Sequence, residues 1–124
     1  MSAVPEPENI PTDLAGKNGK KLMAWRKSHG ITRVTFAQVA NCSERKLATY
    51  EKQTALPQPV QRQTTEAVRL LEALNEIIPE PQLADWLNTP NPGFSDRSPI
   101  QVMLSGEIDL LWDMVYQTRV AAYA

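Results

Sequence analysis

The chain has 124 residues, of which 42% are hydrophobic and 22% charged, and its formal net charge is −1 at pH 7. This length suits one domain or two small helical units, and a single cysteine excludes an internal disulfide framework and fits a reducing cytoplasm. No apolar run approaches the ~20 residues that a membrane-spanning helix needs, and residues 1–13 lack a basic and apolar signal pattern, so we expect a soluble cytoplasmic protein with no membrane partner.

Charge is distributed unevenly along the chain. Residues 15–56 contain nine Lys and Arg against two Glu, whereas residues 57–124 contain four Arg against nine acids. A basic part joined to an acidic part is typical of a DNA-binding half followed by a protein-binding half. The alternative for the second part is a solvated acidic face that has no partner.

Residues 1–16 contain acids and three prolines but few apolar side chains, so we expect an extended arm. The pattern at about residues 18–29 then indicates an amphipathic helix that ends at Gly30, with Leu22 and Trp25 facing inward. The basic residues expected around these two are Lys20, Lys21, Arg26 and Lys27.

Two short helices are predicted next, at roughly residues 33–40 and 43–52. Thr32 and Ser43 precede them as candidate N-caps, because a hydroxyl can accept from backbone N–H groups of the first helical turn. Asn41 lies where the chain must reverse, and Asn tolerates the left-handed conformation well. We therefore expect a sharp turn at Asn41 and Cys42, with Cys42 as a small apolar plug beneath it.

The helical spacing of the apolar residues predicts a small core shared by these two helices. Phe36, Ala37 and Ala40 fall on one face of the first, and Trp25 should pack on Phe36 and Leu47. The second helix should turn Leu47, Tyr50 and the stem of Glu51 inward. Its outward face then carries Glu44, Arg45, Lys46, Ala48 and Thr49.

The region of about residues 20–57 resembles the Xre/Cro type of phage-repressor helix-turn-helix. The resemblance is carried by Gly30, Ile31, Thr32, Phe36-Ala37, the Asn41-Cys42-Ser43 turn, Leu47, Tyr50-Glu51 and Pro57. Asn41 stands where such proteins usually have Gly, and Gln53 where a Gly often follows the second helix. The resemblance implies a DNA-binding domain over residues 17–57, and the alternative is a generic small helical bundle.

For DNA contacts we expect the second helix to enter the major groove. Arg45 and Thr49, with Ser43, Glu44 and Lys46 beside them, would lie at the base edges, and Arg33 would meet a phosphate. The alternative for Glu44 is that it only caps its own helix.

The remaining chain is also predicted to be helical. Residues 52–63, with Pro57 and Pro59, are expected to form a short stiff connection to a long helix from about Thr64. Two prolines end that helix, a short helix follows with Leu83, Trp86 and Leu87, and residues 88–93 give a turn signal. Ser98 should cap a helical turn with Pro99 at its first position, and a final helix should run over residues 107–122.

Residues 64–124 resemble the C-terminal toxin-binding domain of the Xre/MbcA/ParS antitoxins. The resemblance rests on Trp86-Leu87, Asn88-Thr89-Pro90-Asn91, Arg97, Pro99 and Ser105-Gly106-Glu107. The ending departs from the family, in which a glycine usually follows the last helix. The candidate toxin-binding residues are Arg97, Met103, Trp112, Tyr116, Arg119 and Tyr123. The alternative for Trp112 is an intramolecular core position.

Together these patterns predict an all-α protein. The two resemblances imply an antitoxin that binds a cognate toxin, of the NAD-consuming RES-domain type, and represses its own operon as a homodimer on operator DNA. The alternative is a stand-alone Xre-family transcriptional regulator whose C-terminal domain only dimerises.

We expect no catalytic site, metal or cofactor. His29, the only histidine, has no Cys or carboxylate set around it, and Ser105-Gly106 lacks the strand and the second glycine of a nucleophile elbow.

Overall fold

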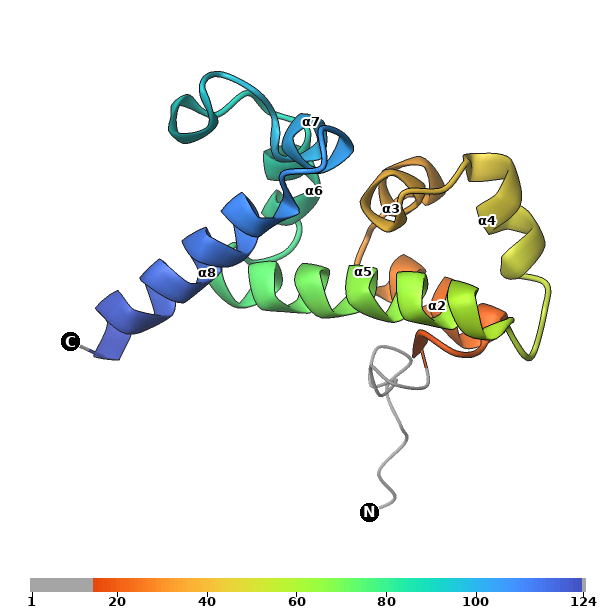
Figure 1. Ribbon diagram of the computed structural model, residues 1–124. Helices are drawn as coiled ribbons and strands as arrows, with labels where there is room; N and C mark the ends of the chain where they lie inside the picture. Colours follow the sequence, from red (N-terminus) through yellow and green to blue (C-terminus); the bar gives the residue numbers. More distant parts are fainter. Residues whose placement is uncertain (1–14, 124) are drawn as a thin grey trace, which may run out of the picture. The chain divides into compact units, whose positions relative to one another are not determined.

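The computed structural model describes residues 15–123, and this part of the chain is built from helices (Figure 1). Its elements are α2 (Gly19–Ser28), α3 (Arg33–Ala40), α4 (Glu44–Tyr50), α5 (Gln58–Ile77), α6 (Gln82–Leu87), the 3-10 helix η1 (Pro92–Phe94), α7 (Pro99–Leu104) and α8 (Ile108–Tyr123). The predicted all-α fold is confirmed. The arm predicted for residues 1–16 lies, up to residue 14, outside the described residues.

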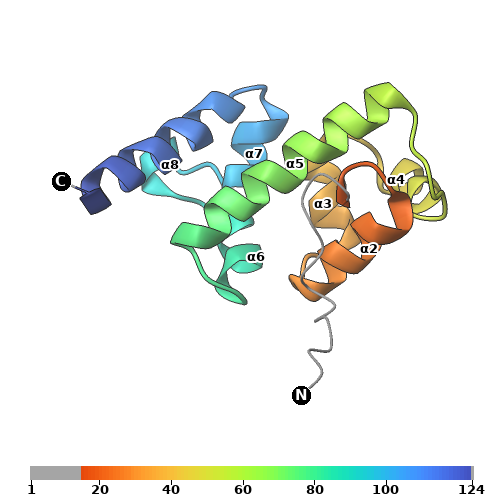
Figure 2. The same cartoon turned by 90° about the horizontal axis from the view of Figure 1, so that it is seen from below.

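The chain divides into two compact units, with the boundary between Arg69 and Leu70 inside α5. The first unit contains α2, α3, α4 and the first part of α5. The second unit contains the end of α5 together with α6, α7 and α8, and Figure 2 shows these helices from below.

The first unit has a core of large side chains contributed by every one of its helices. Trp25 of α2 packs edge-on against Phe36 of α3, with ring centroids 6.3 Å apart, as the sequence predicts. Leu47 of α4 is fully buried, and α3 packs on α4. Leu22 and Val68 are further large side chains of this unit that are fully buried.

The start of α2 lies close to the end of α4. A Cβ on Gly19 would come within 2.6 Å of the Gln53 carbonyl oxygen and closer still to that of Tyr50, so only glycine fits there. Nearby, the backbone N–H of Leu56 donates to the Lys17 carbonyl at 3.2 Å. These contacts close the unit around its core.

The long helix α5 begins at Gln58, so the prediction of a stiff connection up to residue 63 and a helix from Thr64 is wrong. The N–H of Gln61 already donates to the Pro57 carbonyl at 2.9 Å. Pro59 lies in the first turn, where a missing N–H costs nothing because those donors have no partner within a helix. The two prolines therefore start this helix.

The second unit packs α6 on α7 and α7 on α8. Its fully buried side chains are Leu70, Leu71, Leu74, Leu87, Val102, Leu111 and Val115. Before α7, the Ser98 hydroxyl accepts from the Gln101 N–H and the Gln101 side chain accepts from the Ser98 N–H. With Pro99 at the first helical position, this confirms the predicted start of the helix and extends it to a full capping box.

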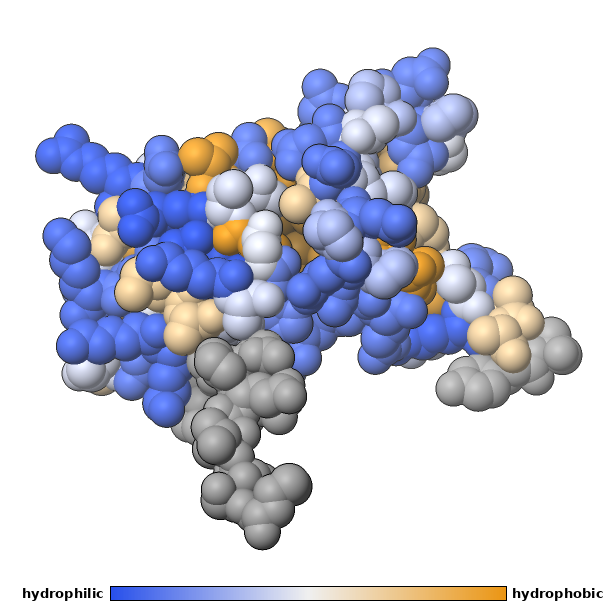
Figure 3. Space-filling view, turned by 180° about the vertical axis from the view of Figure 1, so that it is seen from behind, coloured by the Kyte–Doolittle hydropathy of each residue, from blue (hydrophilic) through white to orange (hydrophobic). Residues whose placement is uncertain are grey.

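The molecular face seen in Figure 3 is mostly hydrophilic, with apolar side chains exposed in small separate areas. Among the described residues, the large apolar side chains that are exposed are Val34, Leu104, Leu110, Tyr116 and Val120. No helix in residues 15–123 is long and apolar enough to cross a bilayer. Over the same residues, no group of three or more His, Cys, Asp or Glu is placed to hold a metal ion.

Candidate functional site

The turn between α3 and α4 has the predicted geometry. The Thr32 hydroxyl accepts from the Thr35 N–H at 3.2 Å, and the Ser43 hydroxyl accepts from the Lys46 N–H at 3.1 Å. Asn41 ends α3 in the left-handed conformation, with φ 58° and ψ 47°. Its carbonyl also accepts from the Gln63 side chain at 2.9 Å, which fastens the turn to α5. The two caps and the turn are confirmed.

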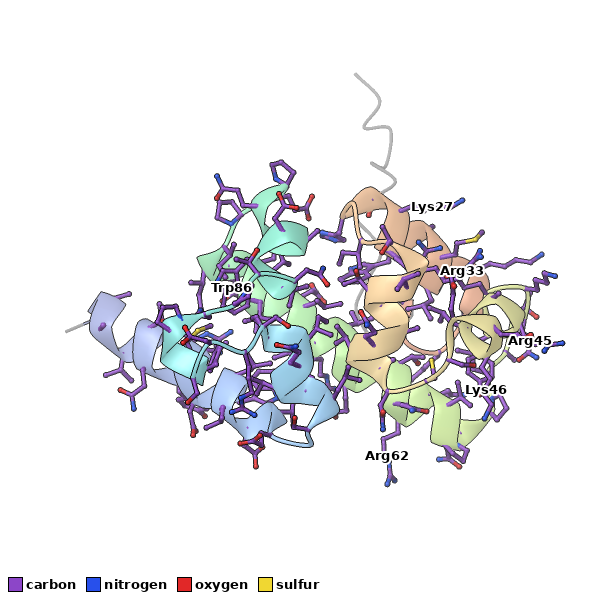
Figure 4. All side chains as sticks on the ribbon, turned by 90° about the horizontal axis from the view of Figure 1, so that it is seen from above. Lys27, Arg33, Arg45, Lys46, Arg62 and Trp86 are labelled. Carbon is purple, nitrogen blue, oxygen red and sulfur yellow. The ribbon has the colours of Figure 1, made fainter. Side chains whose placement is uncertain are left out.

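The outward face of α4 carries the predicted polar residues. Glu44, Arg45, Lys46 and Thr49 are exposed, and Figure 4 shows Arg45 and Lys46 extending away from the helix. Two hydroxyls of the predicted DNA-binding set serve the helix itself, since Ser43 caps it and Thr49 donates to the Arg45 carbonyl at 3.3 Å. The cationic heads of Arg45 and Lys46 have no ion pair within residues 15–123 and are presented to solvent.

A buried ion cluster joins the three helices of this region. Arg26 donates from Nε to Glu51 Oε2 at 2.7 Å and from Nη2 to Oε1 at 3.1 Å, and its Nη1 donates to the Ile31 carbonyl at 3.0 Å. Arg33 adds a bond from Nε to Glu51 Oε1 at 3.0 Å. The placement of Arg26 among the exposed basic residues of α2 is therefore wrong, because this guanidinium is buried between α2 and the end of α4.

The sequence contained a signal for this cluster. Arg26 lies four residues after Leu22, and Glu51 lies four residues after Leu47, so each charge occupies the inward stripe of its helix. A charge at a core position needs a partner of opposite sign, because burying it alone is costly. One acidic and one basic residue in such inward positions therefore predict a buried ion pair between them.

Cys42 lies at the turn and is half-buried, so it is less enclosed than the predicted plug. Burial raises the pKa of its thiol, and the nearby positive charge of Lys46 partly opposes this rise in pKa. The neutral thiol is therefore the form that this site favours.

In the second unit, Arg97 forms an ion pair with Glu107, the residue immediately before α8. Its Nη1 and Nη2 donate to the two carboxylate oxygens of Glu107, the second at 3.5 Å, and its Nε donates to the Phe94 carbonyl at 3.1 Å. This hydrogen bond raises the pKa of Arg97 and lowers the pKa of Glu107, and their mutual attraction acts in the same direction. Arg97, predicted to bind a toxin, thus joins the loop before α7 to the start of α8.

The apolar candidates of the second unit lie at different depths. Met103 of α7 and Trp112 of α8 are half-buried, so each contributes to the unit and still reaches its surface. Tyr116 is 68% exposed, and Val120, one turn further along α8, is 63% exposed. Tyr116 and Val120 form an apolar strip on the outer side of α8 that the unit's own core leaves uncovered.

The end of α8 approaches the end of α5. Arg119 donates to Glu76 Oε2 at 3.0 Å, across a cavity whose lining also includes Ile77, Thr118 and Ala122. Arg119 is one of the predicted toxin-binding residues, and within the chain it pairs with this exposed glutamate. The side chain of Tyr123, the last of the predicted toxin-binding residues, lies outside the described part of the chain.

Comparison with known proteins gives one family. Residues 73–111, from the end of α5 to the first turn of α8, match the antitoxin Xre/MbcA/ParS C-terminal toxin-binding domain. The matched segment contains the Arg97–Glu107 pair and the capped start of α7. No curated protein and no solved structure matches the chain significantly. Residues 73–111 are thus similar to the toxin-binding domain of the Xre/MbcA/ParS antitoxins, as the sequence resemblance predicts.

Proposed function

We propose that this protein is an antitoxin that neutralises a cognate toxin through its second unit and represses its own operon through its first. The toxin-binding domain matched at residues 73–111 is the observation that carries the proposal. The basic surface of the first unit, on the same chain, supplies a reason to expect DNA binding. By family resemblance, the toxin we propose is of the NAD-consuming RES-domain type.

The proposed DNA interface is the outward face of α4. A B-DNA major groove admits one α-helix, and arginine recognises guanine by two parallel hydrogen bonds worth about 1–3 kcal/mol of discrimination. Arg45 is exposed and has no ion pair among the described residues, which suits this role. Thr49, with Glu44 and Lys46 beside it, would contact neighbouring base edges, whereas Arg33 would contact a phosphate.

Arg45→Ala tests this interface. In a gel-shift titration, it should lower affinity for the DNA upstream of the protein's own gene and reduce the ratio to a shuffled duplex by about 5- to 150-fold. Arg69→Ala is the matched control, because Arg69 is exposed and engages Glu66 within α5. An unchanged ratio for Arg45→Ala would refute the proposed base contact.

The proposed toxin-binding surface is the outer side of α7 and α8. Met103, Trp112 and Tyr116 offer the apolar and aromatic side chains that are enriched at the centres of protein interfaces. Arg119 and the last residues of the chain would extend that surface and cover the toxin's active site. On binding, Arg119 would release Glu76 and pair instead with an anionic group of the toxin.

Two experiments test this half of the proposal. Co-expression with the adjacent reading frame, followed by pull-down, should recover a second protein, and its absence would favour the stand-alone regulator. Deletion of residues 120–124 should restore toxicity in cells that express both proteins at equal abundance, while binding to upstream DNA survives. If the shortened protein still protected the cells, covering of the active site by the tail would be excluded.

We further propose that the protein acts as a homodimer, because a single helix-turn-helix makes too few contacts for useful specificity. The uncovered strip of Tyr116 and Val120 on α8 supports an interface in the second unit. Light scattering at micromolar concentration should give twice the mass of the chain, and a monomer would contradict the proposal. Leu110→Ser, which changes an exposed apolar side chain of α8 outside the proposed toxin-binding residues, should shift the equilibrium toward the monomer.

A further inference from the structure

Arg33 reaches solvent although its ion-pair partner is buried. Its side chain is 38% exposed, whereas that of Glu51 is 1% exposed, and the two are joined by the Arg33 Nε at 3.0 Å. A guanidinium has five N–H donors in a rigid plane. The bond to Glu51 uses one of them, so the two terminal nitrogens remain for a second acceptor.

Glu51 is itself fixed in place. Arg26 binds both of its carboxylate oxygens, and the third donor of Arg26 is held by the Ile31 carbonyl. The carboxylate cannot turn without breaking bonds inside the core. Arg33, whose side chain reaches the surface, is therefore bound to a carboxylate that is fixed in the core.

Helix stability does not explain an arginine at this position. Arg33 is the first residue of α3, and the first turn of that helix contains no acid. A cation near a helix N-terminus is unfavourable, since that end already carries partial positive charge. The same combination of an arginine and a helix N-terminus is favourable for an external anion.

We propose that Glu51 is a positioning residue that holds the Arg33 guanidinium ready for a DNA phosphate, an inference that rests on the DNA binding proposed above. An arginine whose Nε is tethered loses less side-chain freedom on binding, and its terminal nitrogens present a planar pair of donors to phosphate oxygens. Figure 4 shows Arg33 on the same side of the first unit as Lys27 and Arg45. Glu51, although buried and acidic, would thus strengthen binding to an anionic partner.

The test is a double-mutant cycle in full-length protein, with Arg33→Ala, Glu51→Gln and the double variant. Binding to a duplex from upstream of the gene and to a shuffled duplex of equal length is titrated at several salt concentrations, at a temperature where circular dichroism shows every variant folded. Glu66→Gln, an exposed glutamate of α5, is the matched control. Arg33→Lys, which leaves the buried Arg26–Glu51 pair intact, provides a readout that does not depend on the stability of Glu51→Gln.

If Glu51 positions Arg33, Arg33→Ala should weaken binding to both duplexes equally and lower the slope of log affinity against log salt by about 0.9. Glu51→Gln should reduce affinity when Arg33 is present and have almost no further effect when Ala is at position 33. Arg33→Lys should resemble Arg33→Ala, because one ammonium cannot bind Glu51 and a phosphate in the same planar geometry.

Equal effects of Glu51→Gln in both backgrounds would show a purely structural role and overturn the inference. Wild-type affinity in Arg33→Lys would do the same, because charge alone would then suffice. If the wild-type protein bound neither duplex, the proposed DNA-binding function would fail together with the inference, whereas an uncoupled cycle with intact wild-type binding would refute the inference alone.

Discussion

Removal of the Arg26 side chain tests whether the buried ion cluster holds the first unit together. Arg26→Ala deletes two bonds to Glu51 and one to the Ile31 carbonyl, and leaves a carboxylate that is 1% exposed with Arg33 as its remaining partner. Breaking a buried pair by removing one partner costs about 3–5 kcal/mol. Because Arg33 still offers one hydrogen bond, we expect the lower end, about 3 kcal/mol of unfolding free energy.

Urea unfolding followed by tryptophan fluorescence reports on the first unit if Trp25 is the only tryptophan. Replacement of Trp86 and Trp112 by Phe in every protein of the series achieves this, since both lie in the second unit. Lys27→Ala, the exposed neighbour, should change the free energy by no more than about 0.5 kcal/mol. A loss below 1 kcal/mol for Arg26→Ala would refute the reasoning, because the cluster would then contribute little to the fold.

Three further predictions follow from single contacts. Gly19→Ala should lower the unfolding free energy of the first unit by about 1–3 kcal/mol in the same urea assay, because its methyl group would overlap the Tyr50 carbonyl. The pKa of Glu107 is lowered by its bond to Arg97, so this bond stabilises the second unit at pH values above the ordinary pKa of about 4.3. The stabilisation is lost as pH falls through the lowered pKa. The melting temperature of Glu107→Gln should therefore depend less on pH below about 4 than that of the wild type. The raised pKa of Cys42 predicts slower reaction with a disulfide reagent at pH 8 than for a free cysteine, and a rate that rises to the free value in urea.

The parts of the fold that the sequence predicted are those fixed by neighbouring residues. Thr32, Ser43 and Ser98 each cap a helix from the position immediately before it, and Asn41 adopts the left-handed conformation that its own side chain tolerates. These features depend on three or four consecutive residues. Caps and turns were therefore readable without knowledge of tertiary contacts.

The start of α5 could not be predicted as firmly, because Pro57 and Pro59 are compatible with two structures. A proline disrupts a helix interior but is well accepted in the first turn. The choice between a stiff linker and an early helix start depends on side chains distant in sequence, including the Thr64 hydroxyl that donates to the Gly16 carbonyl at 2.5 Å. That contact joins residues 48 positions apart, which no local pattern encodes.

The candidate sites were predicted as sets of residues, whereas their pairings were not. The sequence predicts Arg97 and Arg119 as toxin-binding residues, and in the structure each is paired with a glutamate of its own unit. Pairing of this kind depends on which helices meet, and α5 and α8 are separated in the sequence by α6, η1 and α7. The exposed or buried state of an arginine is consequently a tertiary property.

The ion cluster also affects how net charge should be interpreted. Arg26 and Glu51 are both buried and of opposite sign, so their removal from the surface leaves the positive surplus of residues 15–56 unchanged and carried by solvent-facing side chains. In the second unit, Arg97 and Arg119 are paired with acids, so they add little positive field beyond their own glutamates. Under the proposed function, a polyanion such as DNA is attracted to the first unit and repelled by the acidic second one. Under that function, we expect the acidic surface of the second unit to bind a protein partner rather than DNA.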